Sequence, residues 1–119
     1  MFFYDSYAII EMLEGTQTYL PYANNPIITT ALNLGETCLY YLKKNKEAEF
    51  LLLVKGLEIS CLEISPEDAY NAMRFRNKNA GKRLSFIDCI GYCLANSNGL
   101  MFLTGDKEFE YMENVEFVK

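Results

Sequence analysis

Residues Ser85–Asp106 read SFIDCIGYCLANSNGLMFLTGD, and this stretch says most about the fold of the 119-residue chain. It opens on a serine, a residue type that caps helices, and the apolar run that follows predicts a helix over Phe86–Asn96. Ser97-Asn98-Gly99 ends that helix, and Leu100–Leu103 is then typical of a short buried strand. An aspartate follows the strand by two residues. The stretch therefore predicts a helix, a strand and an acidic residue beyond the strand.

The same alternation of helices and strands extends over the rest of the chain. The expected strands are Phe2–Tyr4, Ile27–Thr29, Leu57–Ile64, Leu100–Leu103 and Val115–Val118. The expected helices are Ser6–Glu14, Thr30–Lys44, Glu47–Gly56, Ser65–Ala80 and Phe86–Asn96. Alternating strands and helices are typical of parallel β-α units. We therefore predict the α/β class: a three-layer α/β/α sandwich around a mostly parallel sheet of about five strands, formed by a single domain over residues 1–119.

Composition excludes several kinds of function. Hydrophobic residues make up 50% of the chain and charged residues 23%, which argues against disorder. The chain has no histidine, so Ser-His-Asp and Cys-His catalysis and histidine-ligated zinc or haem are excluded. It has neither a P-loop nor a Gly-x-Gly-x-x-Gly motif, so a nucleotide cofactor is not expected. Four cysteines without Cys-x-x-Cys spacing are expected to be reduced thiols packed in the core.

The sequence also bears on location. The longest apolar stretches are far short of the roughly 20 residues that cross a bilayer, so no membrane association is expected. The N-terminal residues, Met1–Asp5, lack the basic region of a signal peptide. We therefore expect a cytoplasmic protein.

Charge is distributed unevenly. The net charge is −5, yet the segment between Asp68 and Asp88 contains no acid. Its five basic residues are Arg74, Arg76, Lys78, Lys82 and Arg83. Two interpretations are open: a positive rim that holds substrate phosphates, or solvated charge that balances acids elsewhere.

Four of the sixteen acids stand out by position. Asp5 follows the first expected strand directly and Asp106 follows the fourth, so both belong at the edge where parallel strands end. Glu36 and Asp88 lie in expected helices with no basic residue three or four positions away. Each also has an ordinary explanation. Asp88 can complete a capping box with Ser85, Asp5 and Asp106 can cap the next helix, and Glu36 can be solvated.

Together these acids can form one pocket, because they come from four separate elements that end or begin near one sheet edge. A site made only of carboxylate oxygens favours Mg²⁺ or Mn²⁺. Such a metal assists hydrolysis of phosphodiesters and requires no histidine base, which fits the composition.

The motifs resemble those of PIN-domain nucleases and, within that family, of VapC-type toxins. The matching stretches are Phe2–Tyr7, Ile28–Thr30 leading to Glu36, Leu84–Asp88 and Phe102–Asp106. The resemblance implies catalytic and metal-binding roles for Asp5, Glu36, Asp88 and Asp106, with Ser6 and Thr104 as polar supports. It also implies a metal-dependent endoribonuclease, an RNA substrate, a homodimer and a small antitoxin protein. Near the last motif, where many relatives carry a further acid or amide, this chain has only Glu108 and Glu110.

Two other functions fit the same residues. One is a PIN-like nuclease in RNA processing or ribosome maturation. The other is a non-catalytic interaction module that keeps the PIN-like fold. The four acids argue against the second alternative. On either nuclease hypothesis, the basic segment is expected to bind RNA on both sides of the cleaved bond.

Overall fold

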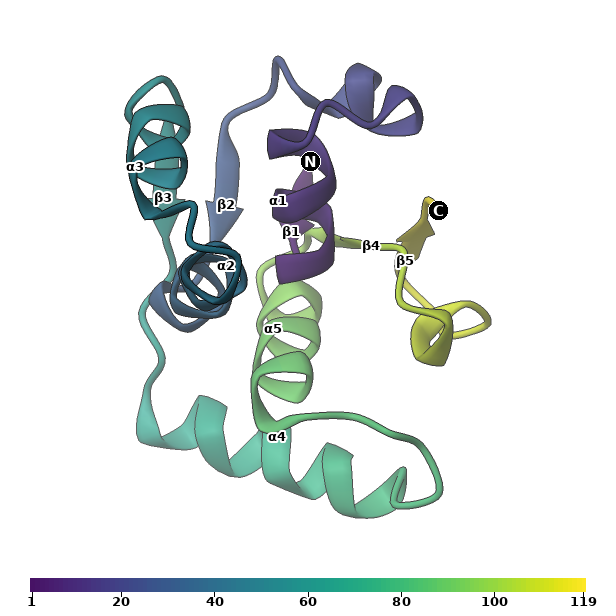
Figure 1. Ribbon diagram of the computed structural model, residues 1–119. Coiled ribbons are helices and arrows are strands. Elements are labelled where there is room, and N and C mark those ends of the chain that lie inside the picture. The colour runs from purple at the N-terminus through teal and green to yellow at the C-terminus, as the bar shows by residue number, and fades with distance from the viewer.

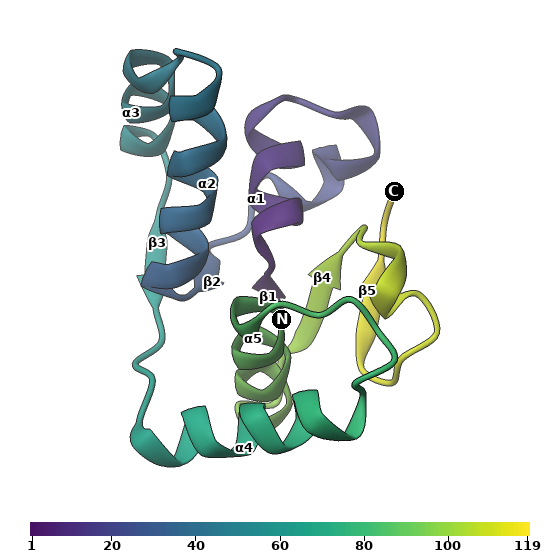
Figure 2. The same ribbon diagram turned by 60° about the horizontal axis from the view of Figure 1, so that its bottom comes forward.

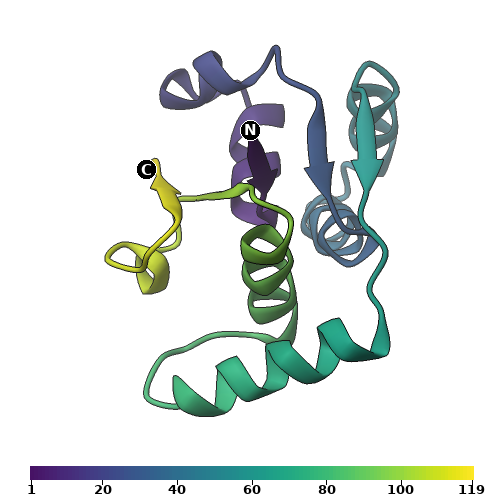
Figure 3. The ribbon, with the colours of Figure 1, turned by 180° about the vertical axis from the view of Figure 1, so that it is seen from behind.

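Five short strands form one sheet in the computed structural model, which describes residues 1–119 (Figure 1). The strands are β1 (Phe2–Tyr4), β2 (Ile27–Thr29), β3 (Ile59–Cys61), β4 (Met101–Thr104) and β5 (Val115–Phe117). Their order in the sheet is β3-β2-β1-β4-β5, and every neighbouring pair is parallel. Figure 3 shows β2 and β3 side by side and pointing the same way. The predicted α/β class with a five-stranded sheet is confirmed, and the sheet is parallel throughout rather than mostly so.

Helices connect the strands close to the predicted places. The α-helices are α1 (Ser6–Leu13), α2 (Ala31–Lys43), α3 (Glu47–Lys55), α4 (Pro66–Lys78) and α5 (Phe86–Ser97). Two short 3-10 helices, η1 (Gln17–Tyr22) and η2 (Lys107–Phe109), complete the chain. None of these helices is long and apolar enough to span a membrane.

Two details differ from the sequence-based prediction. The third strand covers only Ile59–Cys61 instead of Leu57–Ile64, because it lies at the sheet edge and pairs with the three residues of β2 alone. The helix η1 was not expected, since a short 3-10 helix containing Pro21 has no 3.6-residue hydrophobic period.

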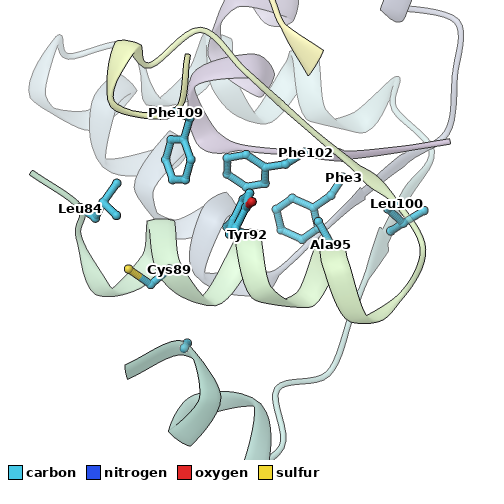
Figure 4. Close-up of a cluster of buried hydrophobic side chains, with 9 residues drawn as sticks. Phe3, Leu84, Cys89, Tyr92, Ala95, Leu100, Phe102 and Phe109 are labelled. Carbon is cyan, nitrogen blue, oxygen red and sulfur yellow. The ribbon is translucent and has the colours of Figure 1, made fainter. Parts of the chain in front are cut away.

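The hydrophobic core lies on both faces of the sheet. Phe3 and Phe102, adjacent across β1 and β4, stack with ring centroids 5.7 Å apart and belong to the cluster under α4 and α5 (Figure 4). Their successors Tyr4 and Leu103 belong to a second cluster, under α1 and η1. Gly91 lets α5 approach the first cluster closely, because a Cβ atom there would lie 2.9 Å from the Phe3 ring. Two covered faces confirm the three-layer sandwich.

The remaining helices frame this sandwich. Helices α2 and α3 lie side by side as a hairpin, and α4 crosses the end of α5 after an extended segment that leaves β3 (Figure 2). All four cysteines are free. The prediction of core thiols is correct for Cys89, which is buried, but wrong for Cys61, which is exposed because it lies on the edge strand β3.

Strand order creates a switch point between β1 and β4. The chain builds β1, β2 and β3 in one direction and then returns to the other side of β1 for β4 and β5. In open parallel sheets, sites form beyond the carboxyl ends of the strands at such a point. Asp5 follows β1 and Asp106 follows β4, so the fold brings the ends of these two motifs to the switch point.

Candidate functional site

Asp5 lies in the turn from β1 to α1 and is buried, with 3% of its surface exposed. Its Oδ2 atom accepts a hydrogen bond from Thr104 Oγ1 at 2.7 Å, while its Oδ1 atom is buried without a hydrogen-bond partner. Burial first, and then the nearby charge of Asp88, raise the pKa of Asp5 to about 7, although the Thr104 hydrogen bond opposes both effects. A buried carboxylate without a cationic partner is costly to keep charged.

Thr104 connects the two acids at the switch point. Its hydroxyl donates to Asp5 and accepts a hydrogen bond from the backbone N–H of Asp106 at 3.1 Å. Asp106 is half-buried, and its Oδ1 atom accepts from the N–H of Glu108 at 3.0 Å, which caps η2. The local explanation of Asp106 as a cap is therefore correct, and it leaves the Oδ2 atom without a protein donor.

The loop that carries Asp106 is fixed by close packing that the sequence did not reveal. Gly105 is buried between the ring of Tyr7 and the carbonyl oxygen of Val118, and a Cβ atom at this position would overlap both. The position therefore requires glycine for lack of space. The Thr104-Gly105-Asp106 sequence offered a turn signal, but nothing in it identifies Tyr7 as the neighbour.

Glu36 is held by the residue that follows Asp5. Ser6 Oγ donates to Glu36 Oε1 at 2.6 Å, which joins the start of α1 to the second turn of α2. Glu36 is half-exposed and accepts this hydrogen bond, so solvation alone does not explain its position. Ser6 in turn accepts a hydrogen bond from Asn33 Nδ2 at 3.0 Å. Nothing in the sequence marks Asn33 as part of the site.

Asp88 stands at the third position of α5 in a capping box. The Asp88 N–H donates to Ser85 Oγ at 3.0 Å, and the Ser85 N–H donates to Asp88 Oδ2 at 2.8 Å. The capping interpretation is thus confirmed. Burial nevertheless raises the pKa of Asp88, and the charges of Asp106 and Glu36 add to the increase while the bonds from Ser85 oppose it.

The four acids lie near enough to affect one another electrostatically. The charges of Asp88 and Glu36 raise the pKa of Asp5, and the charges of Asp106 and Glu36 raise the pKa of Asp88. No cationic side chain is among the main causes that set either pKa. Each carboxylate has one oxygen held by an uncharged donor, and its second oxygen receives no protein hydrogen bond.

The acids are not drawn into a closed metal cage. No three acidic or cysteine side chains lie close enough together to form a metal-binding group in the structure. The donor set nonetheless fits a hard divalent cation, because it consists of carboxylate oxygens and includes the buried, unpartnered Asp5 Oδ1. A cation among these acids would also relieve their mutual repulsion.

Three of the five basic residues flank this neighbourhood. Arg76 donates from Nε to the carbonyl of Leu84 at 3.0 Å, and its guanidinium lies 4.8 Å from the ring centroid of Phe86 at the start of α5. Lys82 Nζ donates to the carbonyl of Glu108 at 3.2 Å, and the Arg83 N–H donates to the Glu108 carboxylate at 2.8 Å. One oxygen of the Glu108 carboxylate is therefore held by the backbone of the loop between α4 and α5.

The other two basic residues are placed differently. Arg74 lies two residues before Arg76 on α4, about 200° around the helix, and its guanidinium carbon is 5.7 Å from the Tyr70 ring centroid. Lys78 is exposed at the last turn of α4. The basic segment is thus spread over more than one side of α4, which its linear order did not show.

Three solved structures that share this fold come from toxin proteins or toxin–antitoxin assemblies. Mycobacterium tuberculosis VapC20, described as a sarcin-ricin-loop-cleaving toxin, matches with a TM-score of 0.82 and 15% identity over 100% of both chains. A toxin–antitoxin complex from Klebsiella pneumoniae matches with a TM-score of 0.76 and 17% identity, covering 98% of this chain and 96% of that one. VapBC2 from Rickettsia felis, bound to a DNA fragment from its promoter, has a TM-score of 0.76 and 13% identity, with 99% and 98% covered.

At these identities the likeness shows the fold alone. Among curated proteins, none matches the sequence. The family model of the PIN domain matches residues 2–115, nearly the whole chain, and includes all four acids. The chain therefore belongs to the PIN domain family.

Proposed function

We propose that this protein is a metal-dependent endoribonuclease in which Asp5, Glu36 and Asp88, together with Asp106, hold Mg²⁺ or Mn²⁺. One observation carries the proposal. Four carboxylates from four elements influence one another at the switch point, each has an oxygen without a protein donor, and no cation neutralises them. Structural ion pairs do not explain such a group, whereas a bound divalent cation does.

The residues of the chain have separable tasks in this reaction. Thr104 and Ser6 orient Asp5 and Glu36 by donating to one oxygen of each. Basic side chains beside α5, such as Arg76 and Lys82, hold the phosphates that flank the cleaved bond. A divalent cation bound by the acids supplies the remaining chemistry, since it lowers the pKa of water and offsets charge on the phosphate.

The chain offers a matched pair of variants for testing this proposal. Asp88 and Asp68 occupy the same position of two equivalent capping boxes, with serine caps at Ser85 and Ser65. Asp68 caps α4, a helix that carries none of the four acids. Asp88→Asn should abolish cleavage, whereas Asp68→Asn changes the same local cap and should leave cleavage intact.

The assay is incubation of total RNA with the protein and Mg²⁺ or Mn²⁺, followed by mapping of new ends. Attack by water leaves 5′-phosphate and 3′-hydroxyl ends. Cyclic phosphate ends would instead indicate attack by the ribose 2′-hydroxyl and contradict the proposed chemistry. Equal cleavage by the wild type and by Asp88→Asn would contradict the assignment of the site.

We also propose that the nuclease acts as the toxin of a toxin–antitoxin pair in the cytoplasm. The support is the shared fold with VapC20 and with chains of two toxin–antitoxin assemblies. Expression of the protein should then arrest growth, and co-expression of a small neighbouring gene product should relieve the arrest. Growth that is unaffected, with cleavage confined to precursor RNA, would favour a role in RNA processing.

A homodimer is proposed on the same family grounds. The α2–α3 hairpin supports it, because large apolar side chains remain exposed there. They are Leu32, Leu39, Leu42, Leu51 and Leu52. Light scattering at micromolar concentration should give the mass of two chains, and a strictly monomeric mass would contradict this part of the proposal.

A further inference from the structure

A directed series of hydrogen bonds runs from the start of α2 to Glu36. Thr30 Oγ1 donates to Asn33 Oδ1 at 2.6 Å, and Asn33 Nδ2 donates to Ser6 Oγ at 3.0 Å. Ser6 Oγ then donates to Glu36 Oε1 at 2.6 Å. Thr30 and Asn33 are fully buried. The bonds from Asn33 to Ser6 and from Ser6 to Glu36 cross between α2 and α1, so the series couples two helices at the edge of the candidate site.

The direction of the series is set by the amide of Asn33. An amide has a donor end and an acceptor end, and Thr30 occupies the acceptor end with its hydroxyl hydrogen. The same Thr30 oxygen accepts the backbone N–H of Asn33 at 3.2 Å, so its own hydrogen is free to point at Oδ1. The Nδ2 end must then face Ser6.

Ser6 has one hydroxyl hydrogen to give. Because its oxygen already accepts from Asn33, the hydrogen points away from the amide. The two acceptors in reach are Glu36 Oε1 at 2.6 Å and the backbone carbonyl of Asn33 at 3.4 Å. The carboxylate is the closer and the more strongly accepting of the two. The Asn33 amide therefore fixes the Ser6 hydroxyl as a donor to Glu36.

We propose that Asn33 is a positioning residue for metal binding: its amide fixes the Ser6 hydroxyl as a donor to Glu36 Oε1, which would leave Glu36 Oε2 free to bind the cation. This inference rests on the proposed function, since it assigns Asn33 a task within that site. Partners behind the ligands of metal sites fix ligand orientation, and their loss typically costs about 10-fold to 100-fold in affinity.

A double-mutant cycle tests the proposal through Mn²⁺ binding, measured by calorimetry without RNA. Asn33→Leu, which has a similar size and no polar atoms, should lower the affinity by about 10-fold, and so should Ser6→Ala. The double variant should lose about 10-fold rather than about 100-fold, because both changes break the same series of bonds. Thr29→Val is the matched control, since Thr29 is equally buried and bonds to the Tyr4 carbonyl outside the series.

The outcomes distinguish a failure of the proposed function from a failure of this inference alone. If wild-type protein binds no Mn²⁺, both are wrong. If the wild type binds Mn²⁺ but Asn33→Leu matches the Thr29→Val control, or if the losses multiply in the double variant, only the inference is wrong. Should Asn33→Leu fail to fold, Thr30→Val tests the same series from its other end, because it removes the hydroxyl that orients the Asn33 amide. It should then lower the affinity non-additively with Ser6→Ala.

Discussion

Replacing Asp5 with asparagine should stabilise the metal-free protein at alkaline pH and not at acidic pH. The ordinary pKa of an aspartate carboxyl is 3.8, and in the folded protein the pKa of Asp5 is raised to about 7, mainly by burial and then by Asp88. Between these two values the folded state binds more protons than the unfolded state, so stability falls as pH rises. From pH 5 to pH 8 this one group lowers the free energy of unfolding by about 2–3 kcal/mol.

Asparagine cannot ionise, so the variant does not suffer this loss. Its amide can still accept from Thr104, while its NH₂ group replaces Oδ1, which has no partner in the structure. That unsatisfied donor costs about 1–3 kcal/mol, but the cost is the same at both pH values and cancels in the comparison. The stability of Asp5→Asn relative to wild type should therefore increase by about 2–3 kcal/mol between pH 5 and pH 8.

Urea unfolding in the presence of EDTA measures this difference. Glu110→Gln is the control, because Glu110 is exposed and its relative stability should change by less than about 0.5 kcal/mol between the two pH values. A difference between Asp5→Asn and wild type that is independent of pH would refute the reasoning, since it would mean that Asp5 is as easily ionised in the fold as in the unfolded chain.

Three further outcomes are expected. Gly105→Ala should lower the free energy of unfolding by about 1–3 kcal/mol and displace Asp106, because its Cβ atom overlaps Tyr7. Gly35→Ala is the control: residue 35 lies in the interior of α2 with open space around it, so this change should raise the free energy of unfolding by about 0.5–1 kcal/mol in the same urea assay. Chelation by EDTA should abolish RNA cleavage, and added Mn²⁺ should restore it; cleavage that persists in EDTA would contradict a metal-dependent site. In a cleavage-dead Asp88→Asn background, replacing three basic residues together should weaken RNA binding. It should also reduce the slope of log binding constant against log salt concentration by roughly 0.7 per lost phosphate contact. An unchanged slope would mean that these basic residues are ordinary surface charge. The replaced residues are Arg74, Arg76 and Lys82.

Much of the fold was predictable because local signals and burial agree. Short apolar runs such as Phe2–Tyr4 form strands, and the serine cap, proline and acid at Ser65–Asp68 begin α4 as expected. What the sequence did not show depends on neighbours far along the chain. The contact of Gly105 with Tyr7 and the bond from Asn33 to Ser6 join elements that only the folded sheet edge brings together.

The members of the candidate site also could not be identified from local sequence alone. Ser65–Asp68 and Ser85–Asp88 make equivalent capping boxes, with bonds between 2.8 and 3.1 Å, so local sequence and local geometry do not distinguish the two aspartates. What distinguishes Asp88 is its surroundings, because the charges of Asp106 and Glu36 act on it and add to the increase of its pKa. A carboxylate has two oxygens, so a helix cap occupies one and leaves the other for a ligand. The structural and the functional explanations of these acids are therefore not alternatives, because an acid that caps a helix with one oxygen can bind a ligand with the other.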